Sequence, residues 1–182
     1  MQSKAEIAVK HWLTEIVIGK NFCPFAQKPF HQDAIRYSTI ASTASQEIIA
    51  RFINEIDILN AHSEIETTLC IIDTKRLSFY EYLDLLDAAN VYLEDKKLTG
   101  TYQIASFHPE YLFDGEAIDA PSHYTNRAPF PILHILREAS LSQVLDNMTS
   151  EHNIPEDNIT RANSLGIAFF EKHLQNAYDL SD

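Results

Sequence analysis

The six residues 67–72, which read TTLCII, constrain the fold of this chain more than any other segment. The run is almost entirely apolar or β-branched, with no alternation between polar and apolar positions. A strand with one face in water alternates, whereas a strand buried on both faces is apolar throughout. We therefore expect residues 67–72 to form the central strand of a sheet that is covered on both sides.

Two further strands and two helices flank this segment in regular alternation. Residues 35–40 (IRYSTI) and 102–107 (YQIASF) have the length and composition of strands. The intervening helices are predicted to begin near Thr43 and at Ser78, each with a Gln or Glu three residues later. Such alternation is typical of crossover connections. The expected fold is therefore α/β, with a small, mainly parallel sheet of three strands or slightly more and crossover helices.

Additional helices are predicted at both ends of the chain. Ser3 opens a capping box, and apolar residues then recur at helical spacing as far as Gly19. Pro131 is expected to start another helix, and residues 153–178 to form the final one. Gly166 lies inside that final helix, where glycine costs about 1 kcal/mol, so we expect a close contact there.

Length and charge restrict what the protein can bind. The 182 residues fit one domain with a single core, so residues 1–182 are taken as one domain. A net charge of −12 argues against nucleic-acid and anionic-membrane partners. Only Cys23 and Cys70 are present, and the N-terminus lacks the apolar block of a signal peptide. The cytoplasm is the expected location.

The segment 108–131 has no regular apolar period, yet it is rich in aromatic residues and proline. Irregular segments of this length inside a compact domain are usually either disordered linkers or ordered functional loops. A linker would be rich in Gly, Ser, Gln and Lys, whereas Tyr, Phe and Pro favour a packed segment. We therefore expect residues 108–131 to form an ordered loop that carries the site.

The carboxyl ends of parallel strands meet at one edge of a sheet, which is where ligands bind in open α/β folds. The residues that follow the predicted strands are Ser42, Thr43, Asp73, Lys75, Arg76, Phe107 and His108. No glycine-rich phosphate loop follows residues 67–72, so P-loop nucleotide binding is not supported, and the sequence identifies no cofactor.

Nine residues have side chains suited to a catalytic or ligand-binding site. Histidine exchanges protons near neutral pH, cysteine is a nucleophile beside a cation, and arginine binds anions. The predicted catalytic residues are Cys23, His108, His134 and Glu138. The predicted ligand-binding residues are Arg36, Asp119, Asn126, Arg127 and Arg137. On a helix that starts at Pro131, His134 and Glu138 would be four residues apart, so that the carboxylate orients the imidazole.

These residues also have structural interpretations. A free cysteine is usually a small core residue, and Cys23 enters before the amino end of the first strand, away from the expected site. Cys70 is assigned to the core. His108 and Arg127 could simply bind backbone carbonyls of the loop. The following residues combine imidazole and carboxylate ligands but lack a tight metal-binding motif, so no metal site is predicted: His108, Asp119, His134 and Glu138.

Two long motifs, YTNRAPFP at 124–131 and HILRE at 134–138, accompany CPFA at 23–26 and FHP at 107–109. Together they resemble a bacterial family labelled domain of unknown function 1415, and the resemblance covers most of the chain. It implies no reaction. In the family pattern an Asn is usual at position 123, so His123 is left out of the predicted site.

Two functions from different classes fit this set of residues. The first is an enzyme that acts on a small anionic metabolite, in which arginine holds the anion and His108 or His134 moves a proton. The second is a module that binds a small molecule or a protein without transforming it. A third interpretation is a purely structural network. They differ in whether His108, Arg127 and His134 point into a common cavity.

Overall fold

Four strands form one mixed sheet, in the order β1-β2-β4-β3. The computed structural model describes residues 2–74, 76–146 and 153–180, so Lys75 lies outside it. The strands are β1 (Ile35–Ile40), β2 (Thr67–Ile72), β3 (Tyr102–Phe107) and β4 (Ile132–Arg137). β1 and β2 are parallel, whereas β4 is antiparallel to both β2 and β3. The predicted α/β class is confirmed.

The prediction of a three-stranded, mainly parallel sheet is wrong, because an antiparallel strand lies between β2 and β3. Residues 132–137, which we assigned to a helix starting at Pro131, form this strand instead. Ile132 is buried on one face of the sheet, and Leu133 and Ile135 are buried on the other. A central strand needs apolar residues on both faces, and a short apolar run does not distinguish a strand from a helix by its period.

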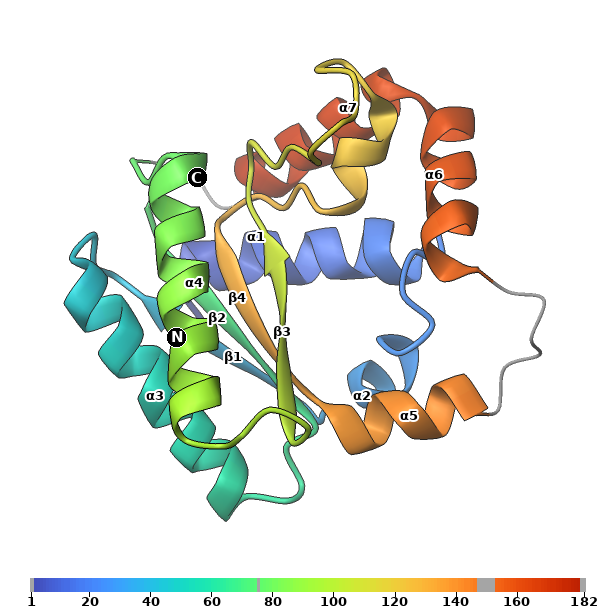
Figure 1. Cartoon of the computed structure of the whole chain (residues 1–182). Helices are drawn as coiled ribbons and strands as arrows, with labels where there is room; N and C mark the ends of the chain where they lie inside the picture. The colour runs from blue at the N-terminus through green and yellow to red at the C-terminus, as the bar shows by residue number, and fades with distance from the viewer. Residues whose placement is uncertain (1, 75, 147–152, 181–182) are drawn as a thin grey trace.

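Helices cover both faces of the sheet (Figure 1). The helices are α1 (Lys4–Trp12), α2 (Gln27–His31), α3 (Ser45–Ala61), α4 (Phe79–Asp95), α5 (Glu138–Asp146), α6 (Ile154–Leu165) and α7 (Ile167–Asp179). α3 and α4 bury one face in a cluster that includes Phe52 and Leu85. α1, α6 and α7 bury the other, with Trp12 and Phe170 in its core. In the part of the chain that is described, no helix is both long and apolar enough to cross a membrane.

The first predicted helix changes its geometry halfway. Ser3 accepts a hydrogen bond from the N–H of Glu6 at 3.0 Å, as its capping-box spacing predicts. After α1, however, residues 13–18 form a π-helix, η1 (Leu13–Ile18). Its wider turn ends where the N–H of Gly19 donates to the carbonyl oxygen of Thr14 at 2.9 Å. Such π segments are rare and occur frequently at functional sites.

The irregular segment 108–131 is packed against the core. It contains one short 3-10 helix, η2 (Pro121–Thr125). Tyr124, Ala128 and Phe130 are buried in the cluster that α1 and α7 cover. The segment thus carries the chain from the end of β3 to the start of β4.

Gly166 separates α6 from α7, so the single final helix that we predicted is in fact two. The close contact expected at this glycine is also wrong, because no heavy atom lies within 4 Å of the position that a Cβ would take. The reason for glycine is its backbone, with φ 74° and ψ 161°. Residues with a side chain almost never adopt this conformation.

We expect Gly166→Ala to lower the free energy of unfolding by about 1–3 kcal/mol, because the added Cβ strains this conformation. Urea unfolding followed by circular dichroism measures the change. Ser164→Ala, at an exposed position of α6, is the matched control and should stay within about 0.5 kcal/mol of the wild type. Equal stability of both variants would contradict the proposed origin of the break.

Candidate functional site

His108 lies directly after β3, and both of its ring nitrogens are used within the fold. Nε2 donates to the carbonyl oxygen of Leu77 at 3.1 Å, and Nδ1 accepts from the N–H of Glu110 at 3.0 Å. The residue is 1 % exposed, and its ring packs against Phe79 and Tyr82. Burial lowers its pKa, which keeps the imidazole neutral. These contacts give His108 a structural role, tying β3 to the turn before α4.

Asn126 and Arg127 hold the irregular segment together. Asn126 donates its side-chain N–H to the carbonyl oxygen of Ser106 at 3.0 Å. Arg127 Nε donates to the carbonyl oxygen of Tyr111 at 3.1 Å, and the guanidinium lies 4.5 Å from the centre of the Tyr124 ring. Both residues therefore fix the loop against the end of β3.

Two further polar residues of the loop, His123 and Asp119, differ in burial. His123 is 1 % exposed; its Nδ1 accepts from the N–H of Phe113 at 3.0 Å, and its Nε2 donates to the carbonyl oxygen of Ala117 at 2.8 Å. Asp119 is exposed. His123 is thus a structural residue of the loop, whereas the side chain of Asp119 faces solvent.

Arg36 faces α3 and compensates a buried charge. Its Nε lies 2.5 Å from Oε2 of Glu55, and the hydroxyl of Ser38 donates to Oε1 of the same carboxylate at 2.8 Å. The Glu55 side chain is 0 % exposed, so its charge depends on this pairing. The hydrogen bond to Glu55 raises the pKa of Arg36. Arg36 is therefore occupied on the face of the sheet opposite His134.

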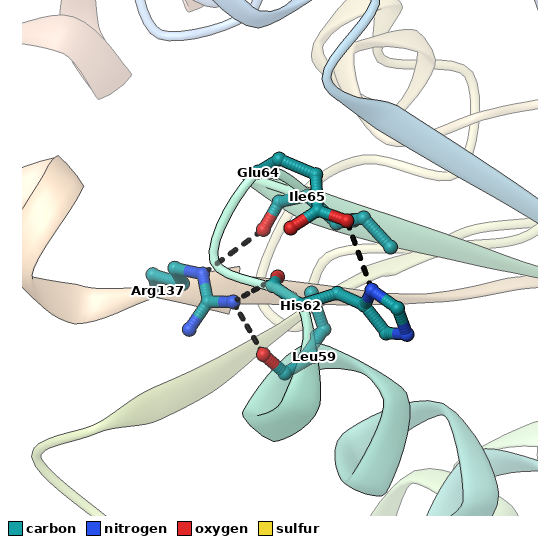
Figure 2. A network of polar contacts seen from close by, with 5 residues as sticks. All are labelled: Leu59, His62, Glu64, Ile65 and Arg137. Atoms are coloured by element: carbon teal, nitrogen blue, oxygen red, sulfur yellow. Dashed lines mark hydrogen bonds and ion pairs between the residues drawn. The ribbon is translucent and has the colours of Figure 1, made fainter.

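Arg137, the last residue of β4, binds backbone carbonyls rather than a carboxylate. Figure 2 shows its guanidinium directed at the carbonyl oxygens of Leu59, His62 and Ile65, at the end of α3 and in the following loop. These distances are 2.6 Å to Leu59, and 3.1 Å to both His62 and Ile65. The network fixes the end of β4 against α3 and leaves the positive charge without an ionic partner among the described residues.

Glu138 does not orient His134, because the two residues lie in different elements. His134 is in β4, whereas Glu138 is the first residue of α5. The carboxylate of Glu138 accepts from the N–H of Gly100 at 3.2 Å, and its own N–H donates to the carbonyl oxygen of Thr101 at 3.0 Å. The helical pair that we expected is therefore replaced by a contact that fixes the turn before β3.

Two recesses lie at opposite edges of the sheet. The recess at the carboxyl edge of β2 and β3 is the more open one, and it is lined by His108, Arg76 and Glu110 among others. His134 is not part of it. Since both nitrogens of His108 are already bonded, this recess offers no free base from a histidine.

The second recess is a cavity of about 150 Å³ at the amino edge of β1 and β2. It lies between η1, the segment around α2, β4 and α5, and Figure 1 shows α2 and α5 side by side there. Its apolar lining comes from Leu13, Pro24, Phe25, Ala26, Pro29, Ile35, Leu69, Leu136 and Leu141. Its polar lining comes from Cys23, Lys28, Gln32, Glu66, Thr67, His134, Arg137 and Ser140.

Thr67 fixes both the orientation and the tautomer of His134. The hydroxyl of Thr67 donates its single proton to the carbonyl oxygen of Ile135 at 2.6 Å. It lies 2.7 Å from Nε2 of His134, so it must accept the proton that Nε2 carries. No described residue bonds to Nδ1, which therefore keeps a free lone pair. Burial lowers the pKa of His134 to about 4, so the ring is neutral at physiological pH.

Cys23 lines the same cavity from the turn that leads into α2. The side chain is half-buried, and burial raises the pKa of its thiol. The nearby N–H groups of Phe25 and Ala26 act in the opposite direction, although the N–H of Ala26 donates to the carbonyl oxygen of Cys23 at 3.3 Å. Burial is the larger effect, so the pKa of the Cys23 thiol lies above its ordinary value.

The charged residues of the cavity have a positive excess. Lys28 and Arg137 each carry a positive charge, and Glu66 carries a negative one. Among the described residues, none of the three belongs to an ion pair. Lys28 is exposed, so its charge lies toward the solvent side of the cavity.

Of the nine predicted site residues, Cys23, His134 and Arg137 line this one cavity. His108 lies at the other edge, and the remaining predicted residues lie outside both recesses. His108, Arg127 and His134 therefore do not share the one cavity that the sequence had led us to expect. Sequence reasoning missed Thr67 and Lys28. The available signal for Thr67 was its polar hydroxyl at the start of a buried strand, but its partner depends on a pairing between β2 and β4 that was not predicted.

Comparisons with known proteins identify a family without identifying a function. A family model described as protein of unknown function (DUF1415) matches residues 4–172, nearly the whole chain. No curated protein and no solved structure matches. Among the described residues, no group of three or more His, Cys, Asp or Glu side chains is placed to hold a metal ion.

We expect Arg36→Met to destabilise the protein by about 3 kcal/mol, because it leaves the buried Glu55 without its partner. The double variant Arg36→Met/Glu55→Met should recover most of this loss, since it removes the charge as well. Urea unfolding of the wild type, the two single variants and the double variant measures the coupling. Additive losses would show that the pair has no structural role.

The pKa of His134 also predicts a pH effect on stability. Its pKa is about 4 in the folded chain and near 6.5 when unperturbed, so the unfolded chain binds the proton more readily. The stability that the neutral ring provides is complete above about pH 6.5 and is lost as the pH falls toward 4. We expect the free energy of unfolding to fall more steeply over this range in the wild type than in His134→Gln, which does not titrate. Parallel pH profiles would contradict the low pKa.

Proposed function

We propose that this chain, which belongs to the DUF1415 family, is an enzyme that acts on a small anionic metabolite in the cavity at the amino edge of the sheet. One observation carries the proposal: Cys23 and His134, which lie far apart in the sequence, line the same small cavity. In this proposal Cys23 is the nucleophile and His134 the base.

The arrangement of three side chains supports catalysis. Activated nucleophiles in enzymes lie near a base, and a third group orients that base. Here the thiol of Cys23 and the imidazole of His134 line one cavity, and Thr67 orients the imidazole. Thr67 is itself held by the carbonyl oxygen of Ile135 at 2.6 Å, so the base has a single fixed orientation.

The charges around the cavity support an anionic ligand. Arg137 is fixed by three carbonyl oxygens and has no carboxylate partner among the described residues. Lys28 adds a second positive charge at the solvent side. Glu66 offsets only one of these charges. A protein with an overall charge of −12 thus has a local positive excess at this cavity.

A second candidate is a binding module that holds a small molecule without transforming it. The observation that favours it is the neutral state of both reactive groups, since burial raises the pKa of Cys23 and lowers that of His134 to about 4. Transfer of a proton from this thiol to this imidazole is unfavourable in the empty cavity. The enzyme and the binding module therefore differ in whether a bound ligand makes this proton transfer favourable.

Thermal unfolding with a panel of small carboxylates and phosphates tests the proposal. A ligand at about 100 times its Kd stabilises the folded chain by about 2.7 kcal/mol, which raises the Tm of a chain of this size by about 5–10 °C. We expect at least one anion to produce such a shift in the wild type and a smaller one in Lys28→Gln. Lys172→Gln, at an exposed position of α7, is the matched control and should behave as the wild type.

Turnover of the stabilising anion, followed by product analysis, then separates the two candidates. Conversion by the wild type but not by His134→Gln supports the enzyme. Binding without conversion supports the binding module. If no anion shifts the Tm, or if Lys28→Gln and Lys172→Gln respond alike, the anionic ligand is contradicted.

A further inference from the structure

We infer that the substrate is a small carboxylate bearing an electrophilic carbon, and that Cys23 Sγ bonds to this carbon while His134 Nδ1 takes the thiol proton. The inference rests on the proposed function and adds to it the substrate class and the covalent step.

The volume of the cavity limits the substrate to a compact molecule. The cavity opens to solvent near Lys28, and its volume of about 150 Å³ is about that of a cavity that binds benzene. Leu13, Phe25 and Leu69 give it apolar walls, so the part of the ligand in contact with them is uncharged. The carboxylate group then lies toward Lys28, and the reactive carbon toward Cys23. Arg137 contributes its charge alone, because carbonyl oxygens and the Tyr102 hydroxyl accept from its donors.

The proton acceptor follows from the hydrogen bonds of β2 and β4. Because Thr67 donates to Ile135, Nε2 of His134 carries the proton and Nδ1 does not. Nδ1 is therefore the nitrogen that can accept the proton of the Cys23 thiol. The backbone N–H group of Phe25 favours a negative sulfur and would stabilise the charge that develops there as this proton leaves.

An anion in the cavity changes the balance that keeps the pair neutral. His134 has a low pKa because of burial alone, with no ionised partner contributing. A carboxylate that enters the cavity would provide the missing opposite charge and favour the imidazolium. Of the charged residues at the cavity, Lys28 and Arg137 attract such an anion, and only Glu66 opposes it. The thiol is thus expected to react with anionic electrophiles in preference to neutral ones of the same shape.

Iodoacetate and iodoacetamide form a matched pair of probes, because they differ in charge and hardly in size. In both reactions the S–C bond of Cys23 forms, the C–I bond breaks, iodide leaves with the bonding electrons, and the thiol proton goes to His134. No oxidant or reductant is needed. Peptide mapping by mass spectrometry follows the modification of Cys23 separately from that of Cys70, which is buried in β2.

The experiment compares the ratio of the two alkylation rates in the folded chain with the same ratio in the urea-denatured chain. We expect the iodoacetate-to-iodoacetamide ratio at Cys23 to be about tenfold higher in the folded chain, the effect of a partly screened nearby charge. Lys28→Gln should reduce this preference, whereas Lys172→Gln should preserve it. An equal or lower ratio in the folded chain overturns the carboxylate as substrate class.

Two measurements test the role of His134. His134→Gln should slow alkylation by iodoacetate about a hundredfold, because glutamine can still donate to Thr67 but cannot act as a base. If this variant does not fold, the wild type alone gives the answer through its pH profile. With His134 as base, the rate should be nearly constant between about pH 6 and 8. A tenfold rise per pH unit, as direct ionisation of a thiol with a raised pKa gives, overturns the role of His134.

The covalent step and the proposed function fail in different experiments. If anions raise the Tm of the wild type but Cys23 in the folded chain reacts no faster than in the denatured chain with either probe, the covalent step is wrong and the anion site remains. If no anion raises the Tm, the proposed function is contradicted at its first step.

Discussion

The position of β4 is the constraint on which the rest of the structure depends. This strand is antiparallel to both of its neighbours, and it separates β2 from β3, so that the chain must return across the sheet to complete it. Its pairing with β2 sets His134 opposite Leu69, beside the hydroxyl of Thr67. At its far end, Arg137 binds the carbonyl oxygens of α3 and the loop after it. Both the cavity and the anchoring of α3 therefore depend on the register of one strand.

Most buried polar side chains in the described part of this protein have hydrogen-bond partners, and the buried atoms that lack one are His11 Nε2, Trp12 Nε1 and Thr68 Oγ1. His108 and His123 each use both ring nitrogens, and Glu55 has a guanidinium and a hydroxyl as partners. Such groups stabilise a fold without being available to a ligand. His134 differs because Thr67 engages only one of its nitrogens. The number of ring nitrogens that are hydrogen-bonded within the fold therefore distinguishes His108, a structural residue, from His134, a candidate base. The residue type alone does not distinguish them.

Local patterns in the sequence correctly predicted three strands and one helix start, because residues close in sequence determine these features. The strands at 35–40, 67–72 and 102–107 have the predicted bounds, and Ser78 and Glu81 form the predicted capping box. These features rest on period, propensity and capping within about ten residues. Residues 132–137 were assigned to a helix because the stripe Ile132, Ile135 and Leu136 fits a helical period as well. Only the presence of β2 and β3 on either side decides between the two, and that information is not local.

The candidate site was harder to predict because its parts meet through tertiary contacts. Cys23 was predicted to be catalytic although it precedes β1 and so lies away from the carboxyl edge, and the structure has it at the amino edge, in the lining of the cavity that also includes His134. We expected Glu138, four residues later in sequence, to be the partner of His134. The partner is Thr67, which lies on the neighbouring strand where β2 pairs with β4. Arg36 and Arg137 have the chemistry of anion-binding residues, but Glu55 and backbone carbonyls occupy their donors. Residue type indicated what these side chains can bind and left open which partner they have.

The strand order has a consequence for synthesis of the chain on the ribosome. β3 pairs only with β4 in the described sheet, and β4 is the last strand to be made. A nascent chain can therefore assemble β1 and β2 early, while β3 waits without a partner and one edge of β2 stays open. Completion of β4 closes both gaps at once and adds His134 to the lining of the cavity that also includes Cys23. Truncated chains that end before Arg137 would thus expose an unpaired strand edge, the feature that makes incomplete β structures prone to aggregate.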